Sequence, residues 1–127
     1  MLKKSLVAAL ILGSVTVSFA QAPAFKRTVL QTVELSIPGR DAVTAKAELP
    51  AGVSSGPHTH PGEEIGYVLE GSATISMDGK STVVKAGEAF AIPSGKVHNA
   101  TNAGTTPLTI VSTYIVEKGK PLATPAK

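Results

Sequence analysis

The residues best suited to chemistry in this chain are its three histidines, His58, His60 and His98. His58 and His60 are two positions apart, and side chains two apart on a strand point to the same face, so both imidazoles can face inward. The chain has no cysteine. Thiolate zinc sites, iron–sulfur clusters, disulfides and thiol catalysis are therefore excluded, and any metal must be held by His, Asp or Glu.

A carboxylate and a further imidazole stand close to turn signals. Glu64 follows the Pro61-Gly62 turn and can return toward the first two imidazoles from the next strand. His98 follows a turn at residues 93–95 and supplies an imidazole from another strand. Neutral imidazoles with one carboxylate suit a divalent first-row metal, and four protein ligands leave about two positions of a six-coordinate ion for substrate, oxygen or water. Glu63 competes with Glu64 for the carboxylate position.

The segments that must position these residues are short and alternate between apolar and polar side chains. Such alternation has the period of a half-buried strand, and no segment beyond residue 20 shows an 11-residue helical period. Asp78-Gly79 between two alternating runs is a strong hairpin signal. The pattern predicts an all-β sandwich or barrel. The expected strands cover residues 29–37, 43–49, 65–70, 72–77, 80–86, 88–93 and 107–116.

The chemistry-bearing residues resemble the two motifs of the cupin family, G-x5-H-x-H-x3,4-E-x6-G and G-x5-P-x-G-x2-H-x3-N. The ten fixed positions are filled, in order, by Gly52, His58, His60, Glu64 and Gly71, and by Gly87, Pro93, Gly95, His98 and Asn102. The short gap between the motifs is similar to that of small single-domain bacterial cupins of the conserved-barrel type. In this resemblance the x6 spacing to Gly71 selects Glu64 rather than Glu63.

The resemblance implies a jelly-roll β-barrel with a metal inside its mouth. Its ligands would be His58, His60, Glu64 and His98, and the metal would be iron, manganese, nickel, copper, zinc or cobalt, which the residues do not distinguish. Glu64 would also act as a catalytic base if it detached from the metal. The leading hypothesis is a metal-dependent oxidoreductase of dioxygenase type acting on a small organic molecule. A metal-dependent decarboxylase or isomerase and a non-catalytic binding barrel are the alternatives.

The first 20 residues predict a signal peptide. Lys3 and Lys4 precede an apolar run that ends near Val17, and small residues follow it. Cleavage is expected after Ala20, or else after Ala22, which places the mature protein in the periplasm or outside the cell. The run is short for a spanning helix, which needs about 20 predominantly apolar residues, so no membrane attachment is expected after cleavage.

Removal of this segment changes the charge balance. The whole chain carries 12 basic and 9 acidic residues, and two of the basic ones lie within residues 1–20. The remainder is nearly neutral, and it has no basic cluster interleaved with aromatics, so nucleic-acid binding is not expected. Residues 21–117 are expected to form the barrel and 118–127 a loose tail, with a lesser alternative of a tail lying along the barrel. The 29–37 strand is a candidate to cover a barrel edge, and both a homodimer and a monomer stay open.

Several side chains near these segments receive structural interpretations. Arg27 and Arg40 would attract an anionic substrate if they faced the mouth, but their positions near strand and turn ends favour a solvated role. Tyr67, Phe90 and Tyr114 are candidates for a pocket lining, and a small barrel favours the core for them.

Overall fold

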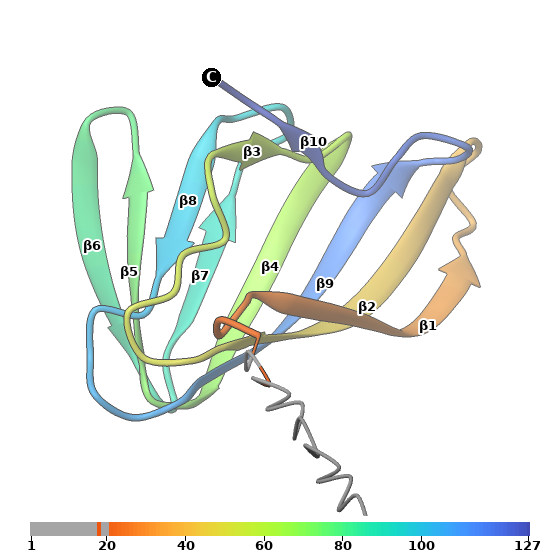
Figure 1. The fold of residues 1–127 in the computed structure, drawn as a ribbon. Helices are drawn as coiled ribbons and strands as arrows, with labels where there is room; N and C mark the ends of the chain where they lie inside the picture. Colours follow the sequence, from red (N-terminus) through yellow and green to blue (C-terminus); the bar gives the residue numbers. More distant parts are fainter. Residues whose placement is uncertain (1–17, 19–20) are drawn as a thin grey trace, which may run out of the picture.

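The protein is described by a computed structural model that covers Ser18 and residues 21–127. Within these residues all regular elements are strands, and they form two five-stranded antiparallel sheets that face each other (Figure 1). The strands are β1 (Lys26–Glu34), β2 (Arg40–Leu49), β3 (His58–Thr59), β4 (Gly62–Glu70), β5 (Ser72–Met77), β6 (Lys80–Lys85), β7 (Ala89–Ile92), β8 (His98–Thr101), β9 (Leu108–Glu117) and β10 (Thr124–Pro125). The predicted all-β fold is confirmed.

The alternating pattern of β2 and β9 fills the space between the sheets. One sheet has the order β1-β2-β9-β4-β7 and the other β10-β3-β8-β5-β6. On β2, Ala45, Ala47 and Leu49 are buried, and on β9 every second residue from Leu108 to Val116 is buried. Residues two apart on a strand share a face, so these strands place one apolar row each in the core and the other row outside.

The hairpin at Asp78-Gly79 forms as expected. Met77 pairs with Lys80 across a two-residue turn, and Asp78 and Gly79 have φ of 53° and 71°. Positive φ at both central positions is the requirement of a type I′ turn, whose twist matches that of the flanking strands. The hairpin joins β5 to β6 at the edge of the second sheet.

The first strand differs from its prediction. It begins at Lys26 rather than Val29, ends at Glu34, and has a bulge between Val29 and Gln31. Val29 and Val33, expected on a half-buried face, are 54% and 46% exposed. The reason is the position of β1 at the edge of its sheet, where it pairs with β2 alone and no described element covers these side chains. The residues that β1 turns inward come earlier, near Arg27.

The C-terminal segment is not loose where the structure describes it. β10 pairs with β3, and the Ala126 amide donates a hydrogen bond of 3.0 Å to the Pro57 carbonyl. Leu122 packs against the small core cluster that contains Tyr114. The expectation of a loose tail is corrected here. Paired backbone groups and one apolar side chain hold the segment along the barrel, and Figure 1 shows it crossing above the sheets.

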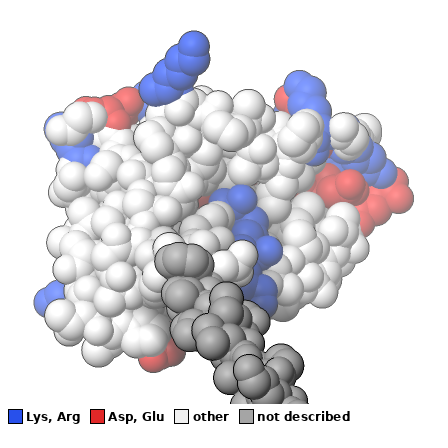
Figure 2. Space-filling model, viewed as in Figure 1, with Lys and Arg blue, Asp and Glu red and all other residues white. Residues whose placement is uncertain are grey.

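The N-terminal predictions lie outside the described residues. These are the signal peptide over residues 1–20, of which only Ser18 is described, and cleavage after Ala20. Within the described part of the chain, no helix is long and apolar enough to cross a membrane. Much of the face shown in Figure 2 carries neither acidic nor basic side chains, and the charged ones gather in small separate groups.

Candidate metal centre

The three histidines meet between the two sheets. His58 lies on β3 and His98 on β8, where the two are direct cross-strand partners, and His60 follows β3. One ring nitrogen of each lies within 4.8 Å of those of the other two, and all three side chains are buried. The amide of Gly95, which has a φ of +70°, donates to the His60 carbonyl at 3.0 Å and so ties the turn before β8 to this cluster.

The orientation of each imidazole is fixed by a backbone carbonyl. The Nδ1 atoms lie 2.7 Å from the Gly56 oxygen, 2.6 Å from the Leu122 oxygen and 2.9 Å from the Lys96 oxygen, for His58, His60 and His98 respectively. A carbonyl oxygen only accepts, so each Nδ1 carries the hydrogen and donates it. In the neutral rings Nε2 then carries a free lone pair. A hydrogen bond donated by the other ring nitrogen is what usually orients a histidine for metal binding.

Glu64 reaches the cluster from the opposite sheet. Its Oε2 lies 3.1 Å from Nε2 of His60 and 3.2 Å from Nε2 of His98, and its Oε1 accepts a 2.7 Å hydrogen bond from the Ser112 hydroxyl on β9. Burial by itself would raise the pKa of Glu64. A proton shared with the His60 and His98 rings, together with the Ser112 hydroxyl, outweighs burial and holds this pKa well below its usual range when no metal is bound, so Glu64 is an anion.

The nitrogen and oxygen atoms that converge here have too few hydrogens to bond to one another, and their lone pairs suit a cation. With all Nδ1 hydrogens donated outward, three Nε2 lone pairs converge with a carboxylate oxygen, and Nε2 of His60 is buried without a hydrogen-bond partner. Lone pairs at about 3 Å repel each other unless a proton or a metal ion lies among them. Three imidazoles and one carboxylate are ligands that suit divalent first-row ions. The residues present therefore fit a metal.

His58 of the cluster and its neighbour Tyr114 have pKa values outside their ordinary ranges. Burial lowers the pKa of His58 to about 4, and His98, His60 and Arg27 add to this effect while the Gly56 carbonyl opposes it. Burial also raises the pKa of Tyr114 to about 12, with the Glu64 anion adding to it. At neutral pH both groups are therefore uncharged.

The residues predicted from the sequence come together in one place. His58, His60, His98 and Glu64 converge as expected from their spacing. Glu63 points the other way and is exposed, so the carboxylate at the cluster is that of Glu64.

The aromatic side chains divide differently from the prediction of a core role for all three. Tyr114 is buried, and its ring centroid lies 4.6 Å from that of His60. Tyr114 and Phe90 line the small cavity at the cluster, whereas Tyr67 is 45% exposed.

Arg27 and Leu122 are site residues that the sequence did not place at the metal centre. Arg27 was expected in solvent, but its Nη2 lies 3.5 Å from Nε2 of His58. The signal was its position two residues after Phe25, because side chains two apart in an extended chain share a face. Leu122 acts through its backbone carbonyl, which no side-chain pattern can reveal.

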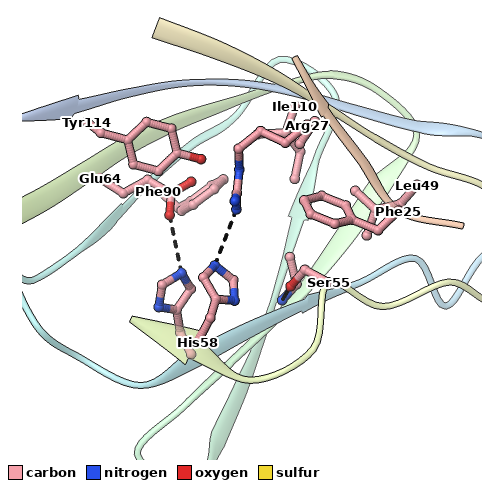
Figure 3. Close-up of a pocket in the computed structure, with 12 residues that line it drawn as sticks. Phe25, Arg27, Leu49, Ser55, His58, Glu64, Phe90, Ile110 and Tyr114 are labelled. Atoms are coloured by element: carbon pink, nitrogen blue, oxygen red, sulfur yellow. Dashed lines mark hydrogen bonds and ion pairs between the residues drawn. The ribbon is translucent and has the colours of Figure 1, made fainter. Parts of the chain in front are cut away.

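Arg27 lines two cavities, of which Figure 3 shows the inner one. The inner cavity, bordered by His58, Glu64, His98 and Arg27, has a volume of about 20 Å³. The outer cavity, bordered by Arg27, His58 and the C-terminal Ala123, has a volume of about 420 Å³. The inner cavity is the size of one or two water molecules, so it has room for an ion but not for an organic molecule.

The contact between His60 and the C-terminal segment gives a first prediction. A chain ending at Lys120 loses the Leu122 carbonyl, which leaves the His60 ring free to turn. We expect its affinity for Co²⁺, measured by titration calorimetry, to fall by about 10- to 100-fold, as for other partners that orient metal-binding histidines. A chain ending at Ala123 keeps this carbonyl and is the control. Equal affinities of the two shortened chains would contradict the role of Leu122.

The low pKa of His58 gives a second prediction, for the metal-free protein in the presence of a chelator. The unfolded histidine titrates near pH 6.5 and the folded one near 4, so the unfolded state binds the proton first. The contribution of neutral His58 to the free energy of unfolding is therefore fully present above about pH 6.5, and it is lost as the pH falls toward 4. We expect urea unfolding of His58→Gln to show a shallower loss over this interval. Equal slopes in the two proteins would show that His58 is not the group responsible.

A comparison with known proteins agrees with this geometry. Residues 45–114 match the family model of the cupin domain. The oxalate-binding protein of Thermotoga maritima is 38% identical over 73 residues, which are 57% of this chain and 60% of that protein. Oxalate oxidase 2 of Hordeum vulgare is 33% identical over 78 residues, which are 54% of this chain and 35% of that protein. The matches thus span about a third to three fifths of these relatives.

A solved structure shows the same fold over a larger share. A conserved protein of Klebsiella pneumoniae with a double-stranded β-helix domain superposes with a TM-score of 0.67 at 25% identity. The superposition covers 84% of this chain and 90% of that one. The domain match includes His58, His60, Glu64 and His98. With the two facing antiparallel sheets and the matched residues, the chain belongs to the cupin family and has its jelly-roll fold.

Proposed function

We propose that the protein is a metal-dependent oxidoreductase of dioxygenase type that acts on a small organic molecule. The observation that carries the proposal is the convergence of three Nε2 lone pairs and the Glu64 carboxylate around one point, with Nε2 of His60 left without a partner. The similarity to an oxalate oxidase supports an oxidoreductase, and the similarity to an oxalate-binding protein supports a small acid as the first ligand to test.

In the proposed function, the residues at this site have different roles. The metal would be held by His58, His60, His98 and Glu64. When bound, it would supply Lewis acidity and, if the ion is redox-active, it would transfer electrons to oxygen. Ser112 orients Glu64 through its hydrogen bond. In the role of a base, Glu64 would accept a proton more readily after leaving the Ser112 hydroxyl and the imidazoles, because these contacts hold its pKa below the usual range.

Apolar side chains shape the surroundings of the site. Leu49, Phe90 and Ile110 line the inner cavity together with the metal-binding side chains. Such walls exclude bulk water and strengthen the electrostatic interactions of the ion with its ligands. The protein thus supports chemistry on a molecule that enters from the outer cavity.

The ligand assignment is tested by metal content. We expect His60→Ala to lose most of the bound metal while the barrel stays folded, because the apolar side chains that make up the core are unchanged. Glu64→Gln removes the anion and should bind metal more weakly. Its matched control, Glu63→Gln, changes the exposed neighbour and should keep the wild-type content. Elemental analysis of protein isolated from its native compartment also identifies the ion. Full metal content in His60→Ala would refute the assignment.

The reaction class is tested by oxygen uptake. Wild-type protein loaded with each of the first-row ions is offered oxalate and a panel of catechols, flavonols and thiols, with His60→Ala as the inactive control. Oxygen consumption that depends on substrate and on His60 is the expected result. Conversion without oxygen would instead favour a decarboxylase or isomerase that uses the ion as a Lewis acid.

A non-catalytic binding barrel is the second candidate. The oxalate-binding relative favours it, and a protein of this kind would bind metal and ligand without consuming either. Retention of bound oxalate with no product and no oxygen uptake would be the outcome that selects it.

The proposal also includes export of the protein and its association into a homodimer. The signal-peptide pattern of residues 1–20 supports a periplasmic or secreted protein. The exposed Val29, Leu30 and Val33 of edge strand β1 support a homodimer, because an unpaired edge with apolar side chains favours association.

A further inference from the structure

We propose that Arg27 binds the carboxylate of an anionic ligand beside the metal and that, without this ligand, it occupies the His58 nitrogen that the metal needs. The inference rests on the proposed metal site and adds to it the charge of the ligand, the residue that recognises it and a coupling between the two binding events.

The position of Arg27 is the first step. It lies on β1, outside both histidine motifs, and it borders the inner cavity as well as the outer one. Figure 3 shows its side chain descending between Tyr114 and Phe25 toward His58. A molecule that enters the outer cavity therefore meets the guanidinium beside His58, at the edge of the metal site.

The guanidinium has no counter-ion. Among the residues that the structure describes, no carboxylate forms an ion pair with Arg27, and its buried Nε has no hydrogen-bond partner. Its carbon atom lies 5.1 Å from the ring centre of Phe25 and 5.8 Å from that of Tyr114, which are cation–π contacts. Aromatic faces hold the cation but offer no acceptor for Nε. A carboxylate supplies acceptors in the geometry of the guanidinium fork.

The contact with His58 makes Arg27 a competitor of the metal. Since Nδ1 of His58 donates to the Gly56 carbonyl, Nε2 is a lone pair, and Nη2 of Arg27 lies 3.5 Å from it. A metal that takes this lone pair must displace the guanidinium and also meets its positive charge. A carboxylate between the two cations removes the repulsion, so each of metal and carboxylate favours the binding of the other.

The two volumes agree with this arrangement. The inner cavity, of about 20 Å³, has room for the ion, while the outer cavity, of about 420 Å³, has room for the organic part of a ligand. Arg27 lies where the two meet. The ligand class is therefore a small carboxylate with its charged end at Arg27 and its organic part toward the C-terminal segment.

The coupling is measured by titrating Co²⁺ into metal-free protein with acetate, with acetamide or with neither. Acetate is chosen because it is a weak chelator, and acetamide is its uncharged counterpart. In the wild type we expect acetate to tighten Co²⁺ binding by at least about fivefold, the lower range of typical coupling, and acetamide to have no effect. Arg27→Gln should bind Co²⁺ alone at least as tightly as the wild type, and acetate should no longer help.

The variants separate charge from geometry. Arg27→Lys keeps the charge but not the fork and should retain only part of the acetate effect. Lys26→Gln removes a charge from the exposed neighbouring position and should behave as the wild type. A full acetate effect in Arg27→Gln, or no acetate effect in the wild type, would overturn the proposal.

A second measurement does not need the metal. The NMR signal of the Arg27 Nε–H in metal-free His60→Ala should shift when acetate is added and stay in place with acetamide. An unchanged signal with acetate would overturn the recognition role even if metal is bound. Conversely, a shift in a protein that binds no metal or consumes no oxygen would uphold Arg27 as the carboxylate site while the proposed function failed.

Discussion

The convergence of lone pairs at one point is the constraint on which the rest of this structure depends. The three Nδ1–H groups donate outward to carbonyls, so the Nε2 atoms and the Glu64 carboxylate face one another without hydrogens to share. Such a cluster is costly in a protein interior unless a cation occupies it. The fold tolerates it because the opposing groups are anchored on separate sheets, His58 and His98 on one and Glu64 on the other.

Most of the site could be predicted from the spacing of the motif residues, and much of the fold from the alternation of apolar and polar side chains. His58 and His60 share a face because they are two apart, and the buried rows of β2 and β9 follow from the same rule. These are local properties of the chain. The sequence could not show that Arg27 reaches His58 or that the Leu122 carbonyl holds His60, because these pairs are 31 and 62 residues apart. Only the closure of the barrel brings them together.

The exposure of β1 shows a related limit. Alternation at Val29 and Val33 predicted a buried face, yet period two states only that one face differs from the other. Whether that face is covered depends on what packs against it, and β1 is an edge strand. The same strand turns Arg27 inward, so the two roles of β1 become clear only when its neighbours are known.

The residues that border the outer cavity and the residues that would hold the metal come from different parts of the chain. The motif residues fix a position for an ion, and they do so with groups that many first-row metals accept. Arg27 comes from the strand before the motifs, and Ala123 and Pro125 from the segment after them, and these residues border the outer cavity. In the proposed arrangement the cation at one end of this cavity would favour a carboxylate, while the C-terminal residues at the other end would limit the size of the organic part. In the proposed function, the ligand would therefore be selected by residues near the two ends of the chain, and the metal would be held by residues from its middle.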